Sequence, residues 1–214
     1  MRSELLKHII THKKGPKLIT FDSFNRADGM PGTPDIGVAY DFTDIHSVGF
    51  QALAISGNKL TFGYNIAGGS TFGALPVAAQ SNALLKAKVI QPGISNASNN
   101  KLLFFIRGGD IVTGGDIMGY ILEYHTATGI KLFHYYLPNW NYDLVADSGV
   151  IPAAGDDLTI QAKQDNITVT RNGTEIINVN GIGETSKILA GAIIVTDGTT
   201  LPYAAIDNLY VYGV

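Results

Sequence analysis

A chain of 214 residues, of which 45% are hydrophobic and only 15% are charged, has ample apolar material for a packed core. Its formal net charge of −3 argues against a nucleic-acid-binding protein, which needs dense Lys and Arg to displace counterions from phosphates. The absence of cysteine excludes a disulfide framework and a thiolate metal site, and no run approaches the ~20 apolar residues that span a bilayer.

The N-terminal segment differs from the rest of the chain. Leu5, Leu6, Ile9 and Ile10 fall at helical spacing and predict a short amphipathic helix, which His12–Lys17 ends with charge, Gly and Pro. The segment lacks the apolar stretch of about 7–15 residues and the cleavage site of a signal peptide. We therefore expect residues 1–17 to be either a frayed terminus or an anchoring arm, and the protein to be retained in a cytoplasm unless an export signal precedes it.

From Leu18 onward the pattern is that of short strands. The expected strands are Leu18–Phe24, Ala52–Ile55, Lys59–Phe62, Ala83–Val89, Lys101–Arg107, Gly119–His125, Ile130–Tyr136, Leu144–Ser148, Asp157–Gln164, Asn166–Arg171, Thr174–Val179, Ala190–Thr196 and Ala204–Tyr212. With no interior helix, they predict an all-β fold, a two-sheet antiparallel jelly-roll sandwich in one domain over residues 18–214.

The turns between these strands support hairpins. Ser56-Gly57-Asn58 and Asn172-Gly173 supply the positive φ values that tight hairpins require. Asp165-Asn166 and Thr126-Ala127-Thr128-Gly129 predict two more. We further expect the opening segment to pair with the last strand, which would close the sandwich on itself.

The best material for binding a sugar lies around the only tryptophan. Tyr136, Asn139, Trp140, Asn141 and Tyr142 combine aromatic planes for stacking on C–H groups with amides for the hydroxyls. The alternative is a long loop between strands whose Trp140 plugs the edge of the core.

A second group of polar residues lies on one predicted hairpin. Glu123 and His125 share a face of one strand and His134 lies on its partner, so the three could hold a transition metal or transfer protons. No H-x-x-x-H motif accompanies them. We therefore favour a polar solvent face, with Tyr120 and Tyr124 packing inward.

Four short motifs follow one another through residues 19–214. They are Asp22-Ser23-Phe24-Asn25-Arg26-Ala27-Asp28-Gly29, then Ile55–Leu60, then Leu158–Ile160 with Ile167–Gly173, and finally Gly191–Ile193 with Ile206–Val211. In this order they resemble the "D-x-F-N-R-x-D-G" opening, the following hairpin, the "L-x-I … I-x-V-x-x-N-G" ribbon and the closing strand pair of laminin-G-like domains in the concanavalin A-like lectin/glucanase superfamily. The resemblance implies the jelly-roll sandwich, a fold that carries lectins, adhesion modules, glycosidases and viral structural proteins.

The resemblance also implies where a cofactor and an active site would lie. Many such sandwiches hold Ca²⁺ where the opening segment meets the closing strand, so Asp22, Asp28 and Asp207 are candidate ligands for a structural calcium. The alternative is that Asp22 and Asp207 cap turns or pair with Arg26. Glucanases of the superfamily use an E-x-D-x-x-E strand, and the four glutamates of this chain form no such motif. We expect no enzyme, and the alternative is a catalytic pair assembled from Glu123 and an aspartate on a neighbouring strand.

These observations lead to two functional hypotheses. Domains of this resemblance are frequent in bacteriophage virions, which are made in the host cytoplasm, so the leading expectation is a non-enzymatic virion structural protein. Its arm would bind other virion proteins, its sandwich would bind host-surface polysaccharide, and it could form a homo-oligomer. The alternative is a carbohydrate-binding or glycoside-processing domain of a secreted bacterial protein.

Overall fold

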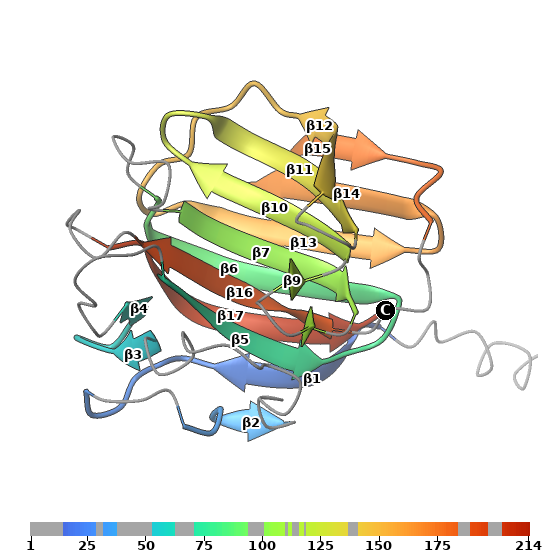
Figure 1. Cartoon of the computed structure of the whole chain (residues 1–214). Coiled ribbons are helices and arrows are strands. Elements are labelled where there is room, and N and C mark those ends of the chain that lie inside the picture. The colour runs from blue at the N-terminus through green and yellow to red at the C-terminus, as the bar shows by residue number, and fades with distance from the viewer. Residues whose placement is uncertain are drawn as a thin grey trace, which may run out of the picture.

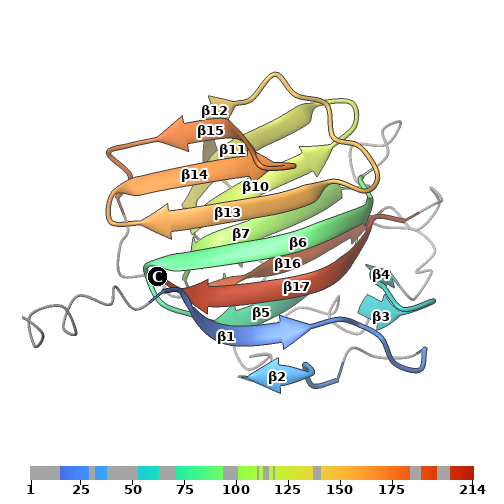
Figure 2. The same ribbon diagram turned by 180° about the vertical axis from the view of Figure 1, so that it is seen from behind.

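The structure of the chain is a computed structural model that describes residues 15–28, 32–37, 53–62, 71–93, 101–109, 111–112, 116–117, 119–136, 141–183, 189–196 and 203–214. In these residues two antiparallel sheets lie face to face, as the two opposite views show (Figure 1, Figure 2). The expected two-sheet sandwich is confirmed. Residues 1–14, most of the predicted arm, lie outside the described residues.

Sheet A contains both ends of the described chain. Its strand order is β15 (Thr174–Val179), β14 (Asn166–Arg171), β13 (Asp157–Lys163), β6 (Ala83–Gln91), β17 (Ala205–Gly213), β1 (Lys17–Asp22) and β2 (Ile36–Gly37), with β3 (Leu53–Ile55) and β4 (Leu60–Phe62) attached beside β17. The expected closure is present, because β1 pairs with β17 from Lys17↔Gly213 to Asp22↔Leu209.

Sheet B supplies the opposite layer. Its order is β12 (Asn141–Asp147), β11 (Gly129–Tyr136), β10 (Gly119–His125), β7 (Lys101–Gly108), β16 (Leu189–Thr196) and β5 (Thr71–Ala78), and a separate ribbon pairs β8 (Ile111–Val112) with β9 (Asp116–Ile117). We call the face of each sheet that meets the other sheet its inner face, and the opposite one its outer face.

Alternation along the strands builds the core. In β6, Leu85, Ala87 and Val89 are buried while Lys86 is exposed, and in β13 Leu158 and Ile160 are buried between more exposed neighbours. Successive side chains of a strand point to opposite faces, so each strand gives one row to the layer between the sheets. None of the described residues belongs to a helix long and apolar enough to cross a membrane.

The predicted tight turns are confirmed except in the hairpin between β13 and β14, where the positive φ of 53° belongs to Gln164 and not to the predicted Asp165-Asn166. Gly57 and Asn58 have φ values of 59° and 60° between β3 and β4, and Asn172 and Gly173 have values of 51° and 78° between β14 and β15. Two consecutive positive φ values are the signature of the hairpin turn whose twist matches that of the strands.

Strand β5 was not predicted from the sequence. It contains Gly73 and Pro76, and both residues normally weaken a strand. However, among the described strands β5 lies at the edge of sheet B and has one neighbour, β16, where Pro76 pairs with Gly191. A proline is tolerated there because no second neighbour requires its missing N–H.

Candidate functional site

The outer face of sheet B is built from cross-strand rows of side chains on β10, β11 and β12. Residues directly opposite each other in an antiparallel pair lie on the same face. Three rows follow from the register: Glu123–Lys131–Asp147, Ile121–Phe133–Leu144 and Gly119–Tyr135–Tyr142.

The third row and its neighbour form an aromatic group at the edge of the sheet. Tyr142 stacks on Tyr135 with ring centroids 5.1 Å apart and planes at 29°, and Phe133 meets Tyr142 edge-on at 5.4 Å. Burial is the main cause that raises the pKa of Tyr135 to about 12, with Glu123 and Tyr142 adding to it, so its hydroxyl is neutral at ordinary pH. We call Phe133, Tyr135 and Tyr142 the aromatic edge.

Exposure along this face increases toward β12. Phe105 and Ile121 in the middle of the sheet are buried, Phe133 on β11 is half-buried, and Leu144 and Tyr142 on β12 are 53% and 55% exposed. Large apolar residues that are exposed next to one another form a patch, and such patches mark interaction sites, whereas single scattered ones do not. The open part of the outer face is therefore the β12 edge.

Charged groups flank the aromatic edge in the first row. Lys131 Nζ lies 3.2 Å from Asp147 Oδ2. Glu123 is buried, and its carboxylate accepts hydrogen bonds from Lys101 Nζ at 2.8 Å and from Thr128 Oγ1 at 2.6 Å. Burial acts to raise the pKa of Glu123, but these two hydrogen bonds outweigh it and the net pKa lies below the ordinary value. Glu123 is thus held ionised.

The sugar-binding residues predicted from the sequence are divided by the sheet. Tyr142 belongs to the aromatic edge, whereas Tyr136 and Asn141 pair with each other across β11 and β12 and lie on the opposite face. Asn139 and Trp140 lie outside the described residues. Asn141 and Tyr142 belong to β12, which begins three residues earlier than the strand expected from Leu144.

Sequence reasoning did not include Phe133 and Tyr135 in the candidate site. Both are on β11, and they share a face because they are two residues apart. The alternation of Lys131, Phe133 and Tyr135 indicates that the three share a face. It indicates a binding site only once β12 is known to pair with β11 and to place Tyr142 beside Tyr135.

The grouping of Glu123, His125 and His134 is not formed. His134 pairs with Tyr120 and stacks on its ring at 4.7 Å and 18°, on the face of sheet B opposite to Glu123. The favoured alternative was also wrong in one respect, because Glu123 and His125 are buried rather than solvated. His125 Nδ1 instead lies 3.1 Å from Thr128 Oγ1.

The three candidate calcium ligands are engaged separately. Both carboxylate oxygens of Asp22 accept hydrogen bonds of 2.7 Å from the guanidinium of Arg26, which is the alternative pairing named above. Asp28 accepts a hydrogen bond from the backbone N of Gly57 at 2.9 Å, and Asp207 is the register partner of Lys88 across β17 and β6. In the part of the chain that the structure describes, no three His, Asp or Glu residues are grouped so as to hold a metal.

Comparisons with known proteins add evidence about the fold. No protein-family model matches the chain, and no curated protein matches it. Among solved structures, the exoplasmic/lumenal domain of VIP36 in its Ca²⁺/Man3GlcNAc-bound form has a TM-score of 0.56 at 11% identity, over 76% of this chain and 81% of its own. The fold is a lectin-type jelly roll.

A second neighbour covers more of this jelly roll. It is a structure described with endo-acting O-glycanases that prominent members of the human gut microbiota express to initiate mucin breakdown, and it has a TM-score of 0.52 at 10% identity, over 92% of this chain and 100% of its own. At such identities the likeness concerns the fold, and function has to be argued from the side chains of the site.

Proposed function

We propose that this protein is a carbohydrate-binding module whose sugar stacks on the aromatic edge of sheet B. The observation that carries the proposal is Tyr142, which is more than half exposed while its ring is held by Tyr135 and Phe133. Aromatic rings with a few polar groups beside them are typical of small-molecule sites. Because its neighbours already fix the ring, little side-chain entropy is lost when a sugar binds.

Polar groups and the fold support the same proposal. The Lys131–Asp147 pair lies two rows from Tyr142 on the same face and offers a donor and an acceptor for hydroxyl groups. The jelly roll is shared with VIP36, which was solved with Man3GlcNAc bound. Calcium is not part of the proposed site, because Asp22 is already bound by Arg26 and Asp28 accepts a hydrogen bond from the backbone N of Gly57.

The test is a glycan array followed by calorimetry on Tyr142→Ala. We expect the wild type to bind at least one neutral glycan, and Tyr142→Ala to weaken that binding by about tenfold or more, which is ~1.4 kcal/mol. Tyr136→Ala is the matched control, since Tyr136 is also an exposed tyrosine at this edge but lies on the opposite face. Equal loss in both variants, or none in Tyr142→Ala, would contradict the proposal.

The loop around Trp140 is a separate contributor that the same array tests. If Trp140→Ala abolishes binding and Tyr142→Ala does not, the sugar binds the loop predicted from the sequence. If both weaken binding, the loop and the aromatic edge form one site.

We further propose that the module does not catalyse hydrolysis. A glycosidase acid needs a carboxyl with a raised pKa, whereas the pKa of Glu123, which lies on the same face as the aromatic edge, is lowered by its bonds to Lys101 and Thr128. Because one structural neighbour is described with O-glycanases, the expectation should be tested directly. Release of reducing ends from mucin O-glycans or a bound glycan would contradict it.

The placement in a virion is a proposal that rests on the laminin-G-like resemblance. Under it, the domain is an outward-facing adhesion or decoration module, and its N-terminal residues contact other virion proteins. Mass spectrometry of purified phage particles checks this, and absence of the chain from them would favour the secreted carbohydrate-binding domain.

A further inference from the structure

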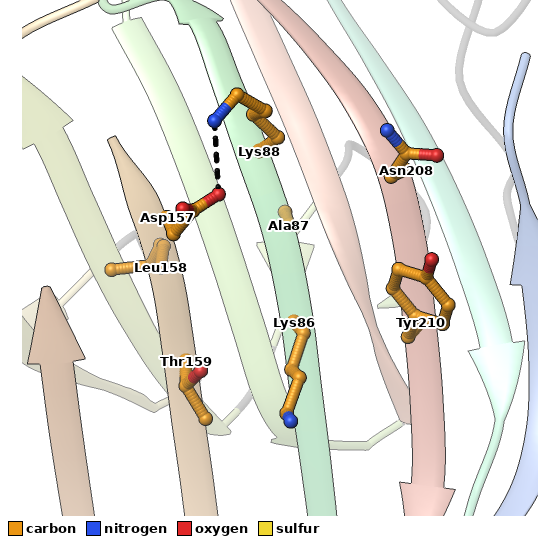
Figure 3. A pocket seen from close by; sticks show the side chains of 8 residues that line it. All are labelled: Lys86, Ala87, Lys88, Asp157, Leu158, Thr159, Asn208 and Tyr210. Carbon is orange, nitrogen blue, oxygen red and sulfur yellow. Dashed lines mark hydrogen bonds and ion pairs between the residues drawn. The ribbon is translucent and has the colours of Figure 1, made fainter. Parts of the chain in front are cut away.

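The outer face of sheet A contains a hollow on the side of the molecule opposite to the aromatic edge. It lies across β13, β6 and β17, the strands at the front of Figure 2. Its volume is about 390 Å³, within the range of roughly 300–1,000 Å³ that is common for ligand sites. The lining residues are Lys86, Ala87, Lys88, Asp157, Leu158, Thr159, Asn208 and Tyr210 (Figure 3).

A β-bulge accounts for the hollow. Lys88 pairs with Asp207 and Lys86 pairs with Tyr210, so two residues of β17, Asn208 and Leu209, oppose the single residue Ala87. Asn208 has a φ of 53°, the left-handed conformation that such irregularities use. The side chains of Ala87 and Leu209 are buried, so neither projects from the outer face at this point and the surface is hollowed there.

Two rows of side chains border the hollow and carry different charge. One row is Asp157–Lys88–Asp207 and the other is Thr159–Lys86–Tyr210. Lys88 Nζ is engaged by Asp157 Oδ1 at 3.1 Å and by the carbonyl of Gly155 at 3.2 Å, and it also faces Asp207. In the described residues Lys86 has no carboxylate partner, and its Nζ lies 5.9 Å from the centroid of the Tyr212 ring.

Tyr210 forms one wall of the hollow and is held between two other aromatic rings. Tyr210 stacks on Phe21 of β1 with ring centroids 4.5 Å apart, and Tyr212 lies parallel to Tyr210 at 6.2 Å. Strand β1 is on one side of β17 and β6 is on the other, so Phe21 occupies the side of Tyr210 away from the hollow. The ring is thereby fixed beside Lys86 and Asn208 (Figure 3).

We propose that this hollow is a second saccharide site, selective for a sugar unit that carries one carboxylate, such as a uronic or sialic acid. The sugar's carboxylate binds Lys86, its hydroxyl groups bind Asp157, Thr159 and the Asn208 amide, and its C–H surface lies against Tyr210. A charge-assisted hydrogen bond to an ammonium that no described carboxylate already pairs with is among the stronger polar contacts. The row with two carboxylates disfavours ligands with several negative charges, such as nucleotides or sulfated chains.

This site lies on the other sheet and does not depend on the aromatic edge. The probes are glucuronic, galacturonic and sialic acid oligosaccharides, each beside its methyl ester, which keeps the stereochemistry and removes the charge. Amide chemical shifts of the labelled protein locate the site, and calorimetry gives the affinity. Lys86→Gln removes the cation, and Lys163→Gln is the matched control on the outer face of β13.

We expect at least one acidic sugar to shift resonances of Lys86, Thr159 and Asn208 and its methyl ester to bind far more weakly. Lys86→Gln should lower the affinity by about tenfold or more, with an unchanged melting temperature, while Lys163→Gln leaves the affinity unchanged. Three results overturn the proposal: no acidic sugar binds, the ester binds equally well, or the shifts map to Tyr142. The last result would support the aromatic edge while rejecting the hollow, so the two sites are distinguished.

Discussion

Arg107 shows how one buried cation joins the two sheets. The residue is fully buried at the end of β7, with a φ of 53° that turns its side chain out of the regular alternation. Its guanidinium donates to the carbonyl of Ser81 at 2.9 Å and to the carbonyl of Gln164. Ser81 lies in the connection from β5 of sheet B to β6 of sheet A, and Gln164 lies in the turn between β13 and β14 of sheet A. Burial lowers the pKa of Arg107, but an arginine remains charged at neutral pH.

Replacing Arg107 by methionine should destabilise the protein. The change keeps much of the apolar stem and leaves two turn carbonyls without their donors, so we expect a loss of about 2–4 kcal/mol in the free energy of unfolding. Urea denaturation of Arg107→Met measures it, with the exposed Lys163→Met as a control. A loss no larger than the control's would show that water replaces the guanidinium without cost.

Gly119 is constrained by the same residue. It has a φ of 128°, and a Cβ at this position would lie 2.3 Å from the backbone oxygen of Arg107. The strain of positive φ and the clash with backbone act together. Gly119 also begins the row that ends at Tyr142, so this glycine allows the close approach of β10 to β7 at the inner end of that row.

At the scale of elements, Asp156 connects β10, β14 and the segment before β13. Its buried carboxylate accepts hydrogen bonds from the hydroxyl of Tyr124, from the backbone N of Ala153 at 2.8 Å and from Asn172 Nδ2 at 2.9 Å. Arg171 Nε lies 2.7 Å from it. Burial acts to raise the pKa of Asp156, but these contacts outweigh it and the net pKa is lowered.

This lowered pKa gives a direction for the pH dependence of stability. A carboxyl whose pKa is lower when folded contributes stability above its unfolded pKa of about 3.9, and that contribution is lost as pH falls through the folded value. We expect the urea midpoint of the wild type to fall as pH decreases below about 4. Asp156→Asn should be less stable at neutral pH by about 2 kcal/mol or more and should lose less on acidification.

Asp157→Asn is the control for this prediction. Asp157 is the next residue, but its side chain is 71% exposed and pairs with Lys88, itself 40% exposed. Such surface pairs contribute about 0–1 kcal/mol. If Asp157→Asn changed the acid profile as much as Asp156→Asn, the buried network would not be its cause.

The sequence predicted elements well where local chemistry decides them. The β3–β4 and β14–β15 hairpins follow from their turn residues, and the β1–β17 pairing follows from the motifs at the two ends. It failed where position in the sheet decides. Pro76 predicts a break in the strand, but an edge strand such as β5 tolerates it. The polar start of β12 predicts a loop, but β12 is also an edge strand and tolerates polar residues.

The candidate site was only partly accessible to sequence reasoning, because register decides it. Tyr136 and Tyr142 are both near Trp140 along the chain, yet pairing places them on opposite faces of sheet B. A bulge has the same consequence in sheet A, where the hollow depends on Asn208 and Leu209 opposing Ala87. Neither register nor a bulge can be read from composition or alternation alone.

For the whole molecule, closure of the sandwich depends on the meeting of its first and last strands. The resemblance implied a calcium ion there, but protein groups hold the turn after β1. Asp22 is buried, is bound by Arg26, and accepts a hydrogen bond from the backbone N of Phe24 at 2.8 Å. A guanidinium that occupies both carboxylate oxygens competes directly with a cation, since either one neutralises the same charge.

We therefore predict that Asp22 binds no calcium that contributes to stability, so that removal of calcium leaves the stability of the protein unchanged. The melting temperature should be the same in excess chelator and in millimolar calcium. Asp22→Asn should lower it equally in both, because the variant weakens a buried ion pair whether or not calcium is present. The opposite pattern, a calcium-dependent rise in the wild type that disappears in Asp22→Asn, would show that the ion displaces Arg26 and closes the sandwich itself. Titration followed by calorimetry would then give its affinity.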